Sequence, residues 1–93
     1  MDARVVDPAM TKLYHPPVKR SIEIAGHKTS ISLEPLFWDL LQHVARSEGL
    51  PLNAVVARID AERIKAEHPP GLATSVRLWL AADLQRRGAS PPQ

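Results

Sequence analysis

The chain has no cysteine, and its four glycines lie far apart from one another. The absence of thiols excludes disulfides, thiolate catalysis and zinc sites with cysteine ligands. Isolated glycines also exclude the glycine-rich loop that cradles a nucleotide phosphate. A chain without disulfides suits a reducing compartment, and we expect a cytoplasmic protein.

Long apolar runs are missing as well, and so are the spacings typical of metal and catalytic sites. No run approaches the roughly 20 apolar residues that span a bilayer, and residues 1–4 lead into no apolar signal segment. The four histidines show no metal-ligand spacing such as HxxxH. Asp60 and Glu62 lie two residues apart on a predicted helix, where their side chains diverge. We therefore predict no membrane partner, no metal, no cofactor and no enzymatic activity.

What remains is the composition of one small, mildly basic domain. The chain of 93 residues is short enough to be a single domain, and a chain of this size gains stability from oligomerisation. Its net charge is +2 and its pI is near 9.4, values that are compatible with nucleic-acid binding. On charge alone, a surface slightly rich in arginine explains these values equally well.

Two segments alternate apolar and polar side chains with the period of a β-strand. Residues 21–25 alternate isoleucine with polar residues, and residues 28–33 alternate Ile31 and Leu33 with serine. Gly26 marks a turn between them, so residues 25–28 are expected to close a β-hairpin. A strand needs a ladder partner, and for residues 28–33 the sequence favours the same strand of a second copy.

Three helices are predicted at about residues 35–47, 51–66 and 72–87, flanked by a flexible arm (1–18) and a tail (88–93). Pro35 suits the first helical position, Gly49 a helix stop, and the prolines at 69–70 end the second helix. Trp38 lies beside the first apolar stripe, and we expect its partial burial against a neighbouring element or subunit. The predicted stripe of the first helix is Leu36, Phe37, Leu40, Leu41, Val44 and Ala45. That of the second is Leu52, Val55, Val56 and Ile59, with Ile64 as a further candidate, and that of the third is Leu72, Val76, Trp79, Leu80 and Leu84.

This order of elements resembles a known family. The motif TSISLE at 29–34, the proline that begins a helix, and the motif GLPLNA at 49–54 resemble the ribbon-helix-helix family. With the segment KRSI at 19–22, residues 19–87 resemble a bacterial subfamily with an extra N-terminal strand and a third helix. The resemblance implies a mainly α fold with a short β-ribbon.

The resemblance implies an intertwined homodimer whose ribbon, one strand from each chain, enters the DNA major groove. It places Lys28, Ser30 and Ser32 on the bases. The backbone N–H groups of Leu52 and Asn53 would bind phosphate at a helix N-terminus, and Lys19 and Arg20 would add phosphate contacts. The implied dimer core consists of Ile31, Leu33, Leu36, Phe37, Leu40, Leu41, Val55, Val56 and Ile59.

The chain departs from the family pattern in three ways. Its outward residues include two serines, where ribbon proteins more often carry Arg, Asn or Gln. Pro51 stands where the family usually has a capping serine. The strand at 21–25 is additional: if it pairs with 28–33 in both chains, the sheet has four strands. Three spacings of about 4.8 Å then exceed roughly 14 Å, whereas the major groove is about 12 Å wide.

The leading hypothesis is a dimeric, DNA-binding transcriptional regulator. The serine-rich ribbon and Pro51 favour an alternative, a protein-interaction module of the same fold that docks a partner on the third helix around Trp79. For Trp79 itself, packing against its own dimer is the simpler interpretation. A further alternative is an antitoxin, although the region after residue 70 is predicted to be helical rather than disordered.

Overall fold

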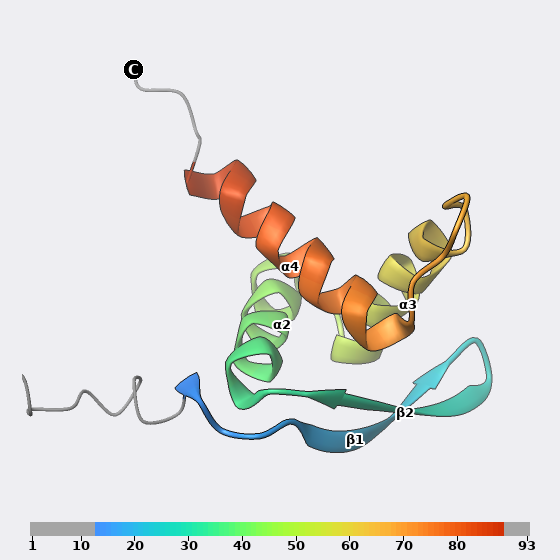
Figure 1. The fold of residues 1–93 in the computed structure, drawn as a ribbon, viewed down its shortest axis with the longest axis horizontal. Coiled ribbons are helices and arrows are strands. Elements are labelled where there is room, and N and C mark those ends of the chain that lie inside the picture. Colours follow the sequence, from blue (N-terminus) through green and yellow to red (C-terminus); the bar gives the residue numbers. More distant parts are fainter. Residues whose placement is uncertain (1–12, 89–93) are drawn as a thin grey trace, which may run out of the picture.

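The computed structural model describes residues 13–88, in which a β-hairpin is followed by helices (Figure 1). This order confirms the predicted mainly α fold with a short ribbon. The elements are β1 (Val18–Ile24), β2 (His27–Leu33), α2 (Pro35–Glu48), α3 (Leu52–Arg63) and α4 (Leu72–Gly88). Most of the predicted arm, residues 1–12, and the tail residues 89–93 lie outside the described part of the chain.

β1 and β2 form an antiparallel pair that runs from Val18 opposite Leu33 to Ile24 opposite His27. Ala25 and Gly26 connect them, with φ angles of 51° and 82°. Positive φ at both central residues defines a type I′ turn, whose twist matches that of the flanking strands. The hairpin is thus confirmed, but its bounds are corrected. The turn takes Ala25, and β1 begins three residues earlier than predicted because β2 offers a partner along its full length.

The pairing corrects one expectation about β2. Its ladder partner within the chain is β1, so β2 does not depend on a second copy for a partner. A two-residue turn holds the strands together at small entropic cost, whereas an interchain pair requires association. A lone strand is therefore no longer a reason for an obligatory dimer.

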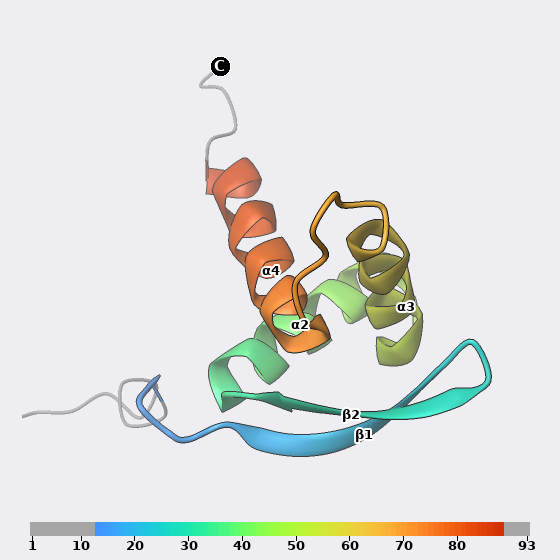
Figure 2. The ribbon, with the colours of Figure 1, turned by 45° about the vertical axis from the view of Figure 1, so that its right-hand side comes forward.

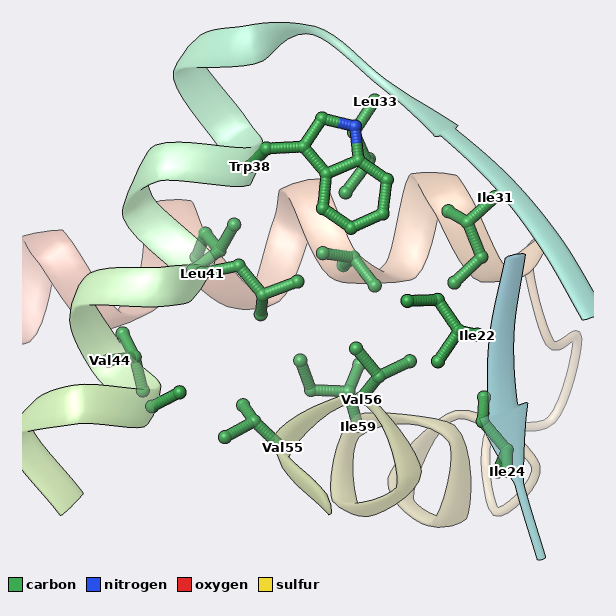
Figure 3. Close-up of a cluster of buried hydrophobic side chains, with 13 residues drawn as sticks. Ile22, Ile24, Ile31, Leu33, Trp38, Leu41, Val44, Val55, Val56 and Ile59 are labelled. Atoms are coloured by element: carbon green, nitrogen blue, oxygen red, sulfur yellow. The ribbon is translucent and has the colours of Figure 1, made fainter. Parts of the chain in front are cut away.

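All three helices α2, α3 and α4 lie on one side of the ribbon (Figures 1 and 2). The side chains of alternate strand residues point toward them, and Figure 3 shows Ile22 and Ile31 facing Val56 and Ile59 of α3. Every element contributes buried residues to this core, and Leu33, Leu41, Val55, Val56 and Val76 are each 0% exposed. One chain therefore closes its own apolar core.

Helix α2 begins at Pro35 and ends at Glu48, and the predicted stop Gly49 follows it with a left-handed φ of 67°. Its buried face is rotated from the predicted stripe: Trp38 is only 2% exposed, whereas Leu36 is 38% exposed. The indole Nε1 of Trp38 donates a hydrogen bond of 2.9 Å to the carbonyl of Val18. Because a buried indole needs such an acceptor, the contact turns Trp38 toward the ribbon and Leu36 toward solvent.

Helix α3 ends at Arg63, three residues before the predicted end. The following N–H groups of Lys65 and Ala66 bond to the carbonyls of Glu62 and Arg63, three residues back rather than four. The prolines at 69 and 70 disfavour helical backbone before them. The chain therefore tightens and leaves the helix within one turn.

Helix α4 buries Val76 and Leu80 as predicted, but Leu84 is 49% exposed. Asp83 is buried instead, and it accepts hydrogen bonds from Arg86 (2.9 Å) and Arg87 (2.7 Å). Burial alone would raise the pKa of Asp83, yet these arginines lower it below its ordinary value. Across residues 13–88, no helix combines the length and apolar character required to cross a membrane.

Candidate nucleic-acid interface

The face of the ribbon that points away from the helices is entirely polar. We call it the outer face. Its side chains are all exposed, and none is aromatic or aliphatic. They form three cross-strand pairs: Lys19 with Ser32, Ser21 with Ser30, and Glu23 with Lys28.

The outer face brings together four predicted site residues, Lys19, Lys28, Ser30 and Ser32. Ser21 was not among the predicted contacts. Alternation with Ile22 was the signal that could have placed Ser21 on this face, and the observed two-residue turn at 25–26 sets it opposite Ser30.

Arg20 is separated from this group. Alternation along β1 places Arg20 on the helix-facing side of the ribbon, together with Ile22. Its guanidinium lies 4.9 Å from the centroid of the Trp38 ring, a distance typical of a cation–π contact. Arg20 is exposed and remains cationic, but it lies beside the ribbon rather than on its outer face.

Most arginines of the helices are paired with carboxylates, whereas the cations of the ribbon are not. Arg58 pairs with Glu48 at 2.6 Å, Arg63 with Asp60 at 2.9 Å and Arg77 with Glu34 at 2.9 Å. Arg86 and Arg87 both pair with Asp83. In contrast, Lys19, Arg20 and Lys28 form no ion pair with a carboxylate of residues 13–88. The cations that are available to an external anion therefore gather on the hairpin, with Arg46 and Lys65 as the others in this part of the chain.

The N-terminus of α3 lies against β1. The side-chain Nδ2 of Asn53 donates a hydrogen bond of 3.2 Å to the carbonyl of Glu23. The N-cap Pro51 supplies no side-chain cap, and its carbonyl accepts from Ala54 and Val55. The first backbone N–H groups of the helix, those of Leu52 and Asn53, have no such intrahelical partner. The structure thus brings these two predicted residues next to the turn half of the ribbon.

Arg77 of α4 ties the opposite end of the ribbon to the helices. Its Nη2 donates to the carbonyl of Ser32 (3.2 Å), its Nε donates to Glu34 (2.9 Å), and its guanidinium lies 5.8 Å from the Phe37 ring centroid. The hydrogen bond from Arg77 lowers the pKa of Glu34 below its ordinary value. Arg77 therefore occupies a backbone acceptor of β2, as a side chain that protects a strand edge does. No local sequence signal links residues this far apart.

The predicted dimer core is divided by the structure. Most of its members are buried within one chain, while Leu36 is exposed and Phe37 and Leu40 are half-buried. Leu36, Phe37 and Leu40 belong to the first turns of α2 and remain accessible to a second chain. The members that the chain itself covers are Ile31, Leu33, Leu41, Val55, Val56 and Ile59.

Two clefts lie beside the helices. One, of about 260 Å³, is lined by Ile59, Pro70, Leu78 and Trp79 among others, and the other, of about 290 Å³, lies under the hairpin turn. Trp79 is half-buried, with the Arg58 guanidinium 5.9 Å from its ring centroid. Both volumes are below the usual range of small-molecule pockets, about 300–1,000 Å³. Residues 13–88 contain no cluster of His, Asp and Glu suited to a metal ion.

A two-stranded antiparallel ribbon backed by helices, with a polar and cationic outer face, is the architecture of proteins that use a β-ribbon as their contact surface. A family model described as the ribbon-helix-helix domain matches residues 17–84, and the chain belongs to this family. The family generally includes DNA-binding transcriptional regulators and antitoxins, its members generally form dimers, and its domains are typically non-enzymatic. No curated protein and no solved structure matches the chain.

Proposed function

We propose that this protein is a cytoplasmic transcriptional regulator that binds duplex DNA with the outer face of its ribbon. The observation that supports this most strongly is a two-stranded ribbon, complete within one chain, whose lysines have no carboxylate partner in the described residues. Two strands about 4.8 Å apart fit, with their side chains, into a major groove about 12 Å wide.

The chemistry of each residue type determines which group of the DNA it suits. Lys19 and Lys28 are compact cations suited to phosphate oxygens or to the acceptors of guanine. The serine hydroxyls reach base edges as donors or acceptors. The free N–H groups at the N-terminus of α3 suit a phosphate at the flank of the groove, and Arg20 adds positive charge on the same side of the ribbon as α3.

We propose further that the protein acts as a homodimer in which each chain keeps its own two-stranded ribbon. A second copy paired along β2 would give four strands and a width above roughly 14 Å, and Arg77 already occupies the Ser32 carbonyl. Association through Leu36, Phe37 and Leu40 avoids both obstacles. Sedimentation equilibrium tests this: Leu36→Glu should yield monomers, whereas Ile64→Glu, at an exposed isoleucine, should not. If both variants remain dimeric, the interface is elsewhere.

Fluorescence anisotropy with labelled duplexes at low salt tests DNA binding. We expect the Lys19→Ala/Lys28→Ala double variant to bind more weakly and to lose about one unit of log–log salt slope per phosphate-contacting lysine. Lys65→Ala is the matched control, because Lys65 is exposed and unpaired within residues 13–88 but lies on the helical side. Absence of binding at low salt, or equal effects of the double variant and the control, would refute the proposal.

The cleft between α3 and α4 supports a second candidate, a protein-interaction module that docks a partner around Trp79. Trp79 also packs on its own core. α4 packs on α3 and β2 in the same chain, so residues 72–88 belong to the folded domain and do not resemble a disordered antitoxin tail. If Trp79→Ala leaves the fold and DNA affinity intact but abolishes binding of a purified partner, this candidate gains support.

A further inference from the structure

One cross-strand pair on the outer face differs from the others. Glu23 and Lys28 lie directly opposite each other, one residue pair from the turn, and both are exposed. They are not in ion-pair contact with each other. The turn end of the hairpin projects beyond the helices in both ribbon views (Figures 1 and 2). This pair is therefore well placed to reach into a groove.

The pair presents a donor beside an acceptor. Side chains directly opposite in an antiparallel pair have Cβ atoms about 4.5–5.5 Å apart. In the major groove, a G·C pair presents the N7 and O6 acceptors of guanine beside the N4 amino donor of cytosine. Lysine commonly donates to the guanine acceptors, and glutamate accepts from the cytosine amino group. The donor and the acceptor of the Lys28–Glu23 pair therefore match the acceptors and the donor of a G·C base pair.

The other pairs of the outer face discriminate less. Serine hydroxyls donate or accept, so Ser21, Ser30 and Ser32 tolerate different base edges. Lys19 faces Ser32 and has no acceptor beside it. A carboxylate on a surface that approaches phosphates weakens binding by repulsion unless it has a donor to accept from. Glu23 is such a carboxylate, and an amino group of a base is the donor that duplex DNA offers.

We propose that Glu23 and Lys28 together read one G·C base pair, and that this pair supplies most of the sequence preference of the protein. The proposal rests on the DNA-binding function proposed above. It extends that function to a residue of β1, because Glu23 accepts from cytosine while Lys28 donates to guanine.

Selection from a random duplex pool, followed by anisotropy titration, tests the proposal. The wild type should enrich one dominant G·C position. Glu23→Gln should shift that position toward adenine, which a glutamine amide contacts at N6 and N7, and the preference for cytosine should fall by about fivefold to a hundredfold. Glu67→Gln, at an exposed glutamate on the helical side, should leave the selected motif unchanged.

The outcomes separate this inference from the function on which it rests. If Glu23→Gln tightens binding to every duplex equally and selects the wild-type motif, Glu23 acts only through its charge and the inference is wrong, while DNA binding stands. If Lys28→Gln leaves the guanine preference intact, the inference is also wrong. If neither the wild type nor any variant binds duplexes at low salt, the proposed function itself fails. Circular dichroism of each variant confirms that the ribbon is folded.

Discussion

The two layers of the molecule handle charge and packing in opposite ways. In the helical layer, Arg58, Arg63 and Arg77 are held by carboxylates, and the apolar side chains close a core. On the outer face of the ribbon, short hydroxyls and unpaired lysines face solvent. Stability therefore resides in the helices and in the inner face of the ribbon, while the outer face is free to contact a partner.

The largest expected difference between the layers concerns stability. Leu41 is 0% exposed, and Leu41→Ala should lower the free energy of unfolding by about 2–5 kcal/mol, since it leaves a cavity in the core. Ser30→Ala on the outer face should change it by less than about 0.5 kcal/mol. Urea unfolding followed by circular dichroism measures both. Similar losses for the two variants would contradict this division of roles.

A smaller effect is expected where the two layers are joined by the indole of Trp38. Trp38→Phe keeps an aromatic ring but removes the donor to the Val18 carbonyl. The loss of this hydrogen bond should cost about 1–3 kcal/mol, because it leaves a partly buried acceptor without its partner. Thermal unfolding provides the measurement. A variant as stable as the wild type would mean that this contact does not hold β1 to α2.

The smallest effect is expected at the Arg77–Glu34 pair, through its dependence on pH. The pKa of Glu34 is lowered in the folded state by the hydrogen bond from Arg77. Its contribution to stability is therefore present above the unfolded pKa and is lost as pH falls through the lower, folded value. Arg77→Met should remove less than about 1 kcal/mol at neutral pH and should lose less additional stability on acidification than the wild type.

Urea titrations between neutral and acidic pH compare the two proteins. The matched control is Arg58→Met, which breaks a pair on α3 but leaves the contact with β2 intact. If the free energies of unfolding of wild type and Arg77→Met fall in parallel as pH falls, the Arg77–Glu34 pair makes no pH-dependent contribution to stability, and the prediction is wrong.

Local patterns in the sequence predicted much of the fold. Alternation gave both strands, Gly26 gave the hairpin, and Pro35 and Gly49 gave the limits of α2. Contacts between distant residues were not predictable in this way. The full burial of Trp38 against the ribbon and the contact of Arg77 with Ser32 depend on how the helices pack on the ribbon, which no local period encodes.

The candidate site was predictable in part for the same reason. Alternation alone assigned Lys28, Ser30 and Ser32 to one face. Alternation with Ile22 also assigns Arg20 to the opposite face, but its contact with Trp38 depends on how α2 packs on the ribbon. The pairing of Glu23 with Lys28 required the register of the hairpin.

The central claim is that the ribbon is completed within one chain, and the absence of native cysteine makes introduced thiols a direct test. Ser21 and Ser30 lie directly opposite each other. Under mild oxidation, a Ser21→Cys/Ser30→Cys variant should form an intrachain disulfide and keep the mass of one chain on a non-reducing gel. Ser30→Cys alone should form no more linked dimer than Ser47→Cys on α2. A predominant Ser30 disulfide between two chains, with no intrachain closure in the double variant, would contradict the account.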